Sequence, residues 1–125
     1  MSKYLYVMAG GAAGCLLRYI AILLVSSRSS GVFPFGTFFV NLTGSLLIGL
    51  LFGFFSVHGD IEDRVKFLLF IGFLGGFTTF SSFAFENMKL ISTGMMGISL
   101  LYIVLSNVIG IALVFGGYYA GLKLK

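Results

Sequence analysis

Four apolar stretches divide the chain, and a short polar link separates each stretch from the next. They run from about Tyr4 to Val25, from Val32 to Val57, from Val65 to Ile91 and from Met95 to Leu122. Each is longer than the ~20 residues with which a helix crosses a hydrocarbon core about 30 Å thick. The links SSRSSG, HGDIEDR and STG are so short that neighbouring helices must run antiparallel. The pattern predicts an all-α membrane protein with four transmembrane helices.

The composition supports a membrane protein and excludes several other classes. The chain is 58% hydrophobic and 10% charged, with a mean hydropathy of +1.08, which leaves too little polar surface for a soluble domain. Its only cysteine, Cys15, allows neither a disulfide framework nor a cysteine metal cluster. The net charge of +4 is spread without a basic run, so we expect no nucleic-acid partner. We expect residues 1–125 to form a single transmembrane domain, with the first stretch retained as a span.

The basic residues favour one orientation only weakly. Five lie on the side of the chain ends and the second link, namely Lys3, Arg64, Lys66, Lys123 and Lys125, and two lie on the other side, Arg28 and Lys89. Because basic residues are enriched in cytoplasmic loops, this places the chain ends in the cytoplasm. The difference is small, so we expect both orientations to occur in the same membrane.

Glycines four residues apart recur in every apolar stretch. The pairs are Gly10 and Gly14, Gly49 and Gly53, Gly72 and Gly76, and Gly117 and Gly121. In membrane helices this spacing gives a flat surface on which another helix packs closely. Four helices enclose little interior of their own, so we expect an oligomer whose subunits build a site between them.

Polar side chains follow helical spacing in the second and fourth stretches. Thr37, Asn41 and Ser45 are spaced by four and share one face of a helix. This stripe is typical either of hydrogen bonds between helices or of a polar track along a pore, and spacing alone does not separate the two. The fourth stretch has a similar stripe of Ser99, Tyr102 and Ser106.

One charged residue, Arg18, lies deep in the first stretch, with more than a turn of apolar chain on either side. Ionisable residues at such positions are costly and usually face protein or water. We therefore expect a functional or vestibule role for Arg18 rather than simple extension to the membrane surface.

The third stretch contains IGFLGGFTTFSSFAFE, in which Phe77, Phe80 and Phe83 recur every third residue with hydroxyl residues between them. Gly75 and Gly76 weaken a helix, and the hydroxyls that follow compete for the backbone. We therefore expect a helix break in this segment. Non-helical backbone survives at membrane depth only where it is buried or lines water, and its free carbonyls are suited to a buried cation.

These segments resemble the Fluc (CrcB) family of fluoride channels over essentially the whole chain. The matching motifs are GGAAGCLLRY, GTFFVNLTGSLLIG and GFLGGFTTFSSF, together with Tyr102 and Ser106 in the fourth stretch. The resemblance implies a dual-topology homodimer, with oppositely inserted subunits, in the bacterial cytoplasmic (inner) membrane. It further implies passive export of fluoride through two pores, which lowers fluoride toxicity.

The resemblance also implies roles for individual residues. The pore and fluoride-binding residues it implies are Phe80, Phe83, Asn41, Ser106, Tyr102 and Arg18. Among them, Tyr102 and Ser106 match a polar track on the fourth helix, and Arg18 matches an arginine near a vestibule. The backbone carbonyls of Gly75 and Thr78 match a site for a structural sodium ion at the dimer centre. The chain departs from some members at Gly110, where they carry a serine one turn beyond the residue that matches Ser106.

Two other classes of membrane protein remain as alternatives. A small four-helix multidrug exporter would share the size, but it would need a membrane-embedded acid, and the one candidate is Glu86. We expect Glu86 instead to pair with Lys89 or to lie at a helix interface. A non-transporting assembly subunit would explain the glycines but not the polar stripes. No nucleophile–base pair or metal-ligand cluster indicates an enzyme.

Overall fold

The computed structural model describes residues 2–59 and 61–124, so Lys125 of the charge count lies outside the described residues. The described chain is helical, and four helical spans are long and apolar enough to cross a membrane. They are α1 (Ser2–Ser26), α2 (Phe35–His58), the segmented span Asp63–Ser92, and α6 (Met96–Gly121). The four predicted transmembrane helices are therefore confirmed, with ends within a few residues of those expected.

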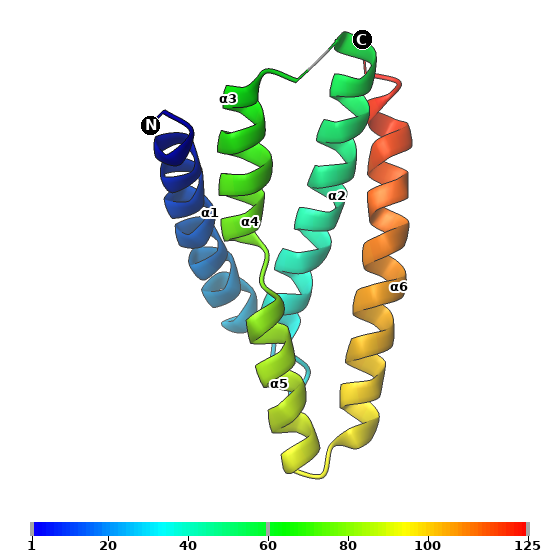
Figure 1. Cartoon of the computed structure of the whole chain (residues 1–125). Helices are drawn as coiled ribbons and strands as arrows, with labels where there is room; N and C mark the ends of the chain where they lie inside the picture. Colours follow the sequence, from blue (N-terminus) through cyan, green and yellow to red (C-terminus); the bar gives the residue numbers. More distant parts are fainter. Residues whose placement is uncertain (1, 60, 125) are drawn as a thin grey trace.

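The spans pack as two pairs that meet near the middle of the molecule (Figure 1). The first half of the third span lies against α1, and α2 lies against α6 along most of its length. The start of α1, the start of the third span and the end of α6 lie at one end, and the link from the third span to α6 lies at the other. The count of basic residues on the two sides of the membrane assumed this same arrangement.

The glycine pairs lie where two helix backbones touch. A methyl group built at Gly49 or Gly53 would overlap a carbonyl oxygen of α6, and one built at Gly117 or Gly121 would overlap a carbonyl oxygen of α2. Between α1 and the third span, a methyl group at Gly10, Gly14 or Gly76 would likewise overlap a carbonyl oxygen of the facing helix. One at Gly72 would lie 2.9 Å from the Val7 carbonyl oxygen, which is still too close. Close packing through small residues, as predicted, therefore holds each pair of spans together.

The third span is built from four helical segments. These are α3 (Asp63–Val65), η1 (Lys66–Leu74), α4 (Gly75–Phe77) and α5 (Phe80–Ser92). The segment η1 is a π-helix of nine residues, whereas most π-helical segments are single turns and many lie at functional sites. The sequence pattern did not predict it.

The chain is extended between α4 and α5, and we call Thr78 and Thr79 the break. Their backbone angles are φ −83°, ψ 157° and φ −148°, ψ 119°. The expected break is therefore confirmed, but Gly75 and Gly76 remain helical, so they do not form it. Thr79 ends it as the N-cap of α5, because its hydroxyl accepts a hydrogen bond from the Ser82 amide.

The break also corrects the phenylalanine stripe. Phe77 belongs to α4, whereas Phe80 and Phe83 belong to α5, so the three do not share one continuous helix. Phe77 is only 4% exposed and stacks on Phe73, with ring centroids 5.9 Å apart. It is a packing residue, separate from the other two.

The buried core of the subunit is small. Among the described residues its apolar members are Val40, Leu74, Phe77, Leu90 and Tyr102. Only 11% to 22% of the most apolar window of each span is buried. Most apolar side chains therefore face outward, as expected for helices in contact with lipid or with another subunit.

Candidate functional site

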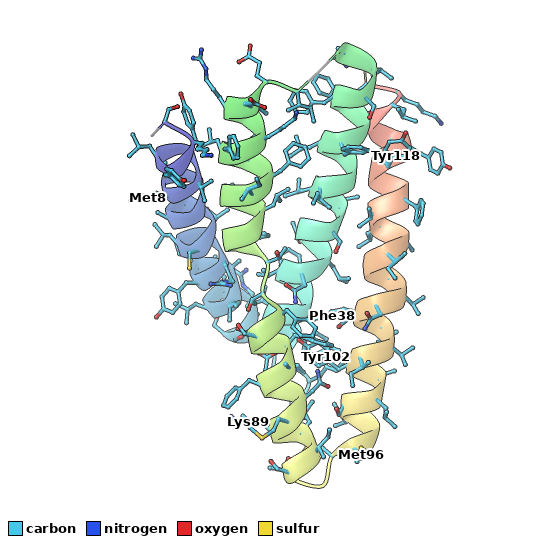
Figure 2. All side chains as sticks on the ribbon, in the orientation of Figure 1. Met8, Phe38, Lys89, Met96, Tyr102 and Tyr118 are labelled. Carbon is cyan, nitrogen blue, oxygen red and sulfur yellow. The ribbon has the colours of Figure 1, made fainter. Side chains whose placement is uncertain are left out.

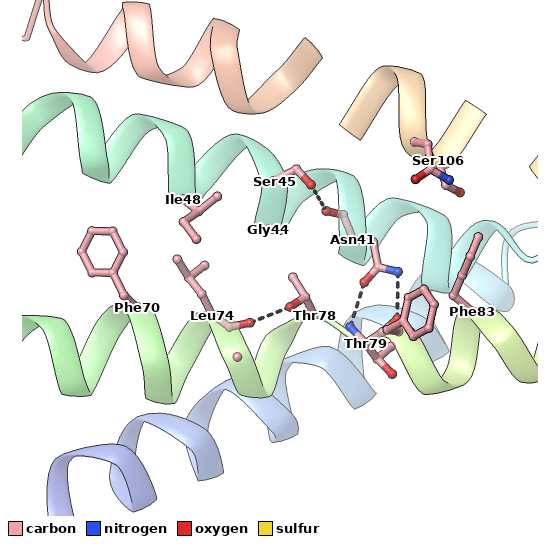
Figure 3. A pocket seen from close by; sticks show the side chains of 13 residues that line it. Asn41, Gly44, Ser45, Ile48, Phe70, Leu74, Thr78, Thr79, Phe83 and Ser106 are labelled. Atoms are coloured by element: carbon pink, nitrogen blue, oxygen red, sulfur yellow. Dashed lines mark hydrogen bonds between the residues drawn. The ribbon is translucent and has the colours of Figure 1, made fainter. Parts of the chain in front are cut away.

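A cavity of about 410 Å³ lies beside the break, where α2, the third span and α6 meet (Figure 3). We call it the central cavity. Its walls bring together most of the predicted site residues, namely Asn41, Gly75, Thr78, Phe80, Phe83 and Ser106. Phe80 is 79% exposed, so the cavity opens to the surface of the subunit on that side. No side chain in its walls carries a charge.

Asn41 holds the break in place from α2. Its Nδ2 donates to the Thr79 carbonyl at 3.0 Å, and its Oδ1 accepts from the Thr79 amide at 2.8 Å (Figure 3). Ser45, one turn further along, donates to the Asn41 carbonyl at 2.9 Å. At Asn41 the polar stripe therefore makes hydrogen bonds between spans, which confirms the first of its two interpretations. Because Asn41 and Ser45 also line the central cavity, the reading as a pore track is not contradicted.

The two phenylalanines of α5 form an aromatic wall of the cavity. The ring centroids of Phe80 and Phe83 are 5.8 Å apart, with their planes inclined at 40°. Phe83 also meets the ring of Tyr102 edge to face, at 4.8 Å between centroids. An aromatic ring is electropositive along its edge, so this wall offers weak positive charge without an ionised group.

Ser106 presents a hydroxyl to the same cavity from α6. Its Oγ is buried and has no hydrogen-bond partner among the described residues. Buried polar groups are nearly always paired, so an unpaired hydroxyl in a cavity wall is suited to a ligand or water. One turn on, a Cβ at Gly110 would lie 3.5 Å from the Ser45 hydroxyl, which is ordinary contact. The Cβ of the serine that some family members carry here would therefore meet only ordinary contacts.

Tyr102 is fully buried and does not line the central cavity. Its hydroxyl donates to Glu86 Oε2 at 2.9 Å, and Thr37 donates to Glu86 Oε1 at 2.6 Å. Its ring lies beside Phe38 between α2 and α6 (Figure 2). Tyr102 thus ties α6 to α5 through a carboxylate.

The partners of Glu86 correct one expectation from the sequence. Glu86 makes no ion pair with Lys89; two hydroxyls from α2 and α6 hold its carboxylate instead. The Lys89 ammonium lies over the Phe85 ring, 5.9 Å from its centroid. The alternative expectation, that Glu86 lies at a helix interface, is confirmed. Sequence spacing within one helix could not reveal partners on two other helices.

Arg18 turns inward from α1 and reaches the break. Its Nη1 donates to the Thr78 carbonyl at 3.2 Å, and its Nη2 lies 3.0 Å from the Cys15 sulfur. It does not line the central cavity. Arg18 therefore contacts protein at membrane depth, which agrees with the expectation that it does not simply extend to the membrane surface.

The carbonyls expected to hold a sodium ion differ in what they already bind. In a continuous helix the Thr79 amide would bond to the Gly75 carbonyl, but it bonds to Asn41 instead. The Gly75 carbonyl thus loses its helical donor. The Thr78 carbonyl accepts one hydrogen bond from Arg18 and keeps its second lone pair. Carbonyl oxygens are hard ligands, and no cluster of three His, Cys, Asp or Glu side chains occurs among the described residues to offer another metal site.

Comparison with known proteins gives one consistent result. The family model described as CrcB-like protein, Camphor Resistance (CrcB), matches residues 5–118. A protein of Maridesulfovibrio salexigens named fluoride-specific ion channel FluC is 40% identical over 121 residues, 97% of this chain and 96% of its own length. Proteins of the same name from Thermus thermophilus and Bacteroides fragilis are 44% and 38% identical, over 97% and 100% of this chain and 96% and 100% of their own lengths.

Proposed function

Because the chain belongs to the CrcB family, we propose that it is a fluoride-selective ion channel that exports cytoplasmic fluoride passively and so lowers fluoride toxicity. It is a multi-pass integral membrane protein of the bacterial cytoplasmic (inner) membrane. The observation that carries the proposal is the central cavity, in which amide, hydroxyl and phenylalanine side chains converge without any charged side chain. Such a lining would suit an anion that must be both held and released.

Fluoride is small and strongly hydrated, so a pore must replace the water contacts that the ion loses. Asn41 and Ser106 supply polar donors, and the edges of Phe80 and Phe83 supply weak positive charge. A fixed cation in the wall would hold fluoride tightly, whereas conduction requires binding weak enough for release. Hydrogen fluoride enters cells as a neutral acid and dissociates in the cytoplasm, so a passive anion pathway needs no energy source.

The remaining site residues extend this pathway in the proposal. Ser106 and Tyr102 are the two residues of the polar track on α6, one turn apart. Ser106 lines the central cavity, whereas Tyr102 lies behind its wall with its hydroxyl donating to Glu86. Arg18 would lie on α1 at a vestibule of the pore, and its hydrogen bond to the Thr78 carbonyl stabilises the break.

The active unit in the proposal is an antiparallel homodimer of oppositely inserted subunits, with two pores. Support comes from the small buried core and from the exposure of Phe80, whose ring would be left facing lipid in a single subunit. The weak difference in basic residues between the two sides would let both orientations insert. A second subunit would close the open side of the central cavity.

A structural sodium ion at the dimer centre completes the proposal. The Gly75 and Thr78 carbonyls of each subunit would hold it, which is supported by the loss of the helical donor at Gly75 and by the second lone pair of the Thr78 carbonyl. The ion would supply charge to join two uncharged segments of broken helix. Its role is structural, so it takes no part in conduction.

Growth under fluoride stress tests the proposed function in cells. We expect the chain to restore growth of a bacterium that lacks its own fluoride exporter, in medium with fluoride. Failure to restore growth at a normal membrane abundance would contradict the proposal. Resistance to cationic drugs would favour the exporter alternative, but Glu86 is bound by Thr37 and Tyr102 rather than free to carry protons and drugs.

A further inference from the structure

The helix that carries both cavity phenylalanines is not held by the helix before it. Two extended residues separate α5 from α4, so the backbone does not fix the direction or rotation of α5. Side chains that join α5 to its neighbours must therefore set where Phe80 and Phe83 lie. The described polar links from α5 to other spans are those of Glu86 and of the next residue, Asn87.

Asn87 and Ser99 form the most deeply buried polar pair between described helices. The Ser99 hydroxyl donates to Asn87 Oδ1 at 2.7 Å, and the two residues are only 1% and 6% exposed, respectively. Asn87 Nδ2 donates in turn to the Phe83 carbonyl at 2.9 Å. A single side chain thus connects α6 directly to the backbone of a cavity phenylalanine.

The residues next to Asn87 and Ser99 on the two helices show what their hydrogen bond controls. Ser99 and Tyr102 are three residues apart on α6, and Phe83 and Asn87 are four residues apart on α5, so each pair shares a helix face. The Phe83 ring meets the Tyr102 ring edge to face one turn from the hydrogen bond. A slip or rotation of α5 against α6 would break the hydrogen bond and turn the ring together.

We propose that Asn87 and Ser99 are positioning residues, which set the rotation of α5 so that the Phe83 ring faces the central cavity. Buried polar pairs are poor sources of stability, but they specify one arrangement of packed helices over others. In a membrane the apolar residues around them would pack about equally well in several registers, which leaves this choice to polar contacts. The inference rests on the proposed function only for its effect on fluoride flux.

The test separates positioning from stability by comparing single and double variants. Ser99→Ala leaves Asn87 Oδ1 buried without a partner, so we expect both less folded dimer and a lower flux per channel. Asn87→Leu with Ser99→Ala removes both polar groups, which is close to neutral for stability. We expect the double variant to recover dimer but to keep a fluoride flux per channel roughly tenfold below wild type, equivalent to about 1.4 kcal/mol.

The matched control is Ser92→Ala. Ser92 is an exposed hydroxyl on α5 that bonds only to its own helix, at the Lys89 carbonyl, so its loss should change neither dimer nor flux. Reconstitution at limiting protein density measures the fraction of active vesicles and the rate in each active vesicle separately. A double variant with wild-type flux per channel would overturn the positioning role.

A second readout needs no fluoride transport. With 4-fluorophenylalanine at position 83, the ¹⁹F spectrum should show one narrow resonance in the wild type and in the Ser92→Ala control. We expect a shifted or broadened resonance in the double variant; an unchanged resonance would refute the inference. If the wild type carried no fluoride at all, the proposed function would fail while this spectrum still tested the position of the ring.

Discussion

Replacing the two cavity phenylalanines by isoleucine separates a pore role from a packing role. Phe80→Ile and Phe83→Ile keep most of the apolar volume and remove the electropositive ring edge. Volume-conserving apolar swaps usually cost less than about 1.5 kcal/mol of stability. We expect both variants to stay folded and dimeric but to lose at least about tenfold in fluoride flux, which corresponds to about 1.4 kcal/mol.

The structure predicts different outcomes if these residues only pack. Phe80 is 79% exposed in the subunit, so its replacement should cost the fold of a single subunit little stability. Phe83 loses an edge-to-face contact with Tyr102, a kind of contact worth about 0.5–1.5 kcal/mol. A packing role therefore predicts flux per channel near wild type in both variants, with any loss of total flux matched by a loss of folded dimer. A pore role predicts that both variants lose flux to a similar extent.

Efflux from liposomes, measured beside size-exclusion profiles, distinguishes these outcomes. Phe77→Leu is the control, because Phe77 is buried against Phe73 on the other side of the break. Its flux per channel should stay near wild type even if some stability is lost. Near-normal flux in both isoleucine variants would remove the pore role assigned to the rings.

Three further predictions concern assembly. A methyl group at Gly117 would overlap the Leu46 carbonyl, whereas one at Gly116 meets nothing within 4 Å. Gly117→Ala should therefore lower thermal stability in detergent and Gly116→Ala should not; equal effects would refute close packing of α2 and α6. A methyl group at Gly75 also meets nothing within the subunit, so Gly75→Ala should disrupt the dimer only if a partner lies there. Thr78→Ser should be mild, because the backbone and not the side chain would hold the proposed sodium ion. Dimer of wild-type stability in Gly75→Ala would count against that interface. Reporter fusions at the chain end should appear on both sides of the membrane, and fusions found wholly on one side would rule out dual topology.

The sequence predicted the spans and the close packing at the glycines well, because both depend on local properties. Span length follows from hydropathy, and close helix contact follows from glycine spacing such as Gly49 and Gly53. The break was expected in the correct segment but at the glycines. Gly75 and Gly76 tolerate a helix, and the chain leaves it at Thr78 and Thr79, where Asn41 of another helix takes over the backbone hydrogen bonds.

The sequence could not predict features that depend on contacts between spans. The π-helix η1 has no apolar period of its own, and the hydroxyl partners of Glu86 come from α2 and α6. The burial of Tyr102 behind the cavity wall was equally hidden, because Ser99, Tyr102 and Ser106 share one helix face in sequence. Which part of that face is buried depends on how the neighbouring helices pack against it.

The most direct test of the central claim is the ion selectivity of the purified wild-type protein in liposomes. Vesicles loaded with equal concentrations of fluoride and chloride are diluted into medium without either ion, and an ion-selective electrode follows each anion after the membrane potential is clamped. The proposed channel predicts rapid fluoride efflux without an added proton gradient and little chloride efflux over the same time. Equal efflux of both anions, or fluoride efflux that requires a proton gradient, would contradict it.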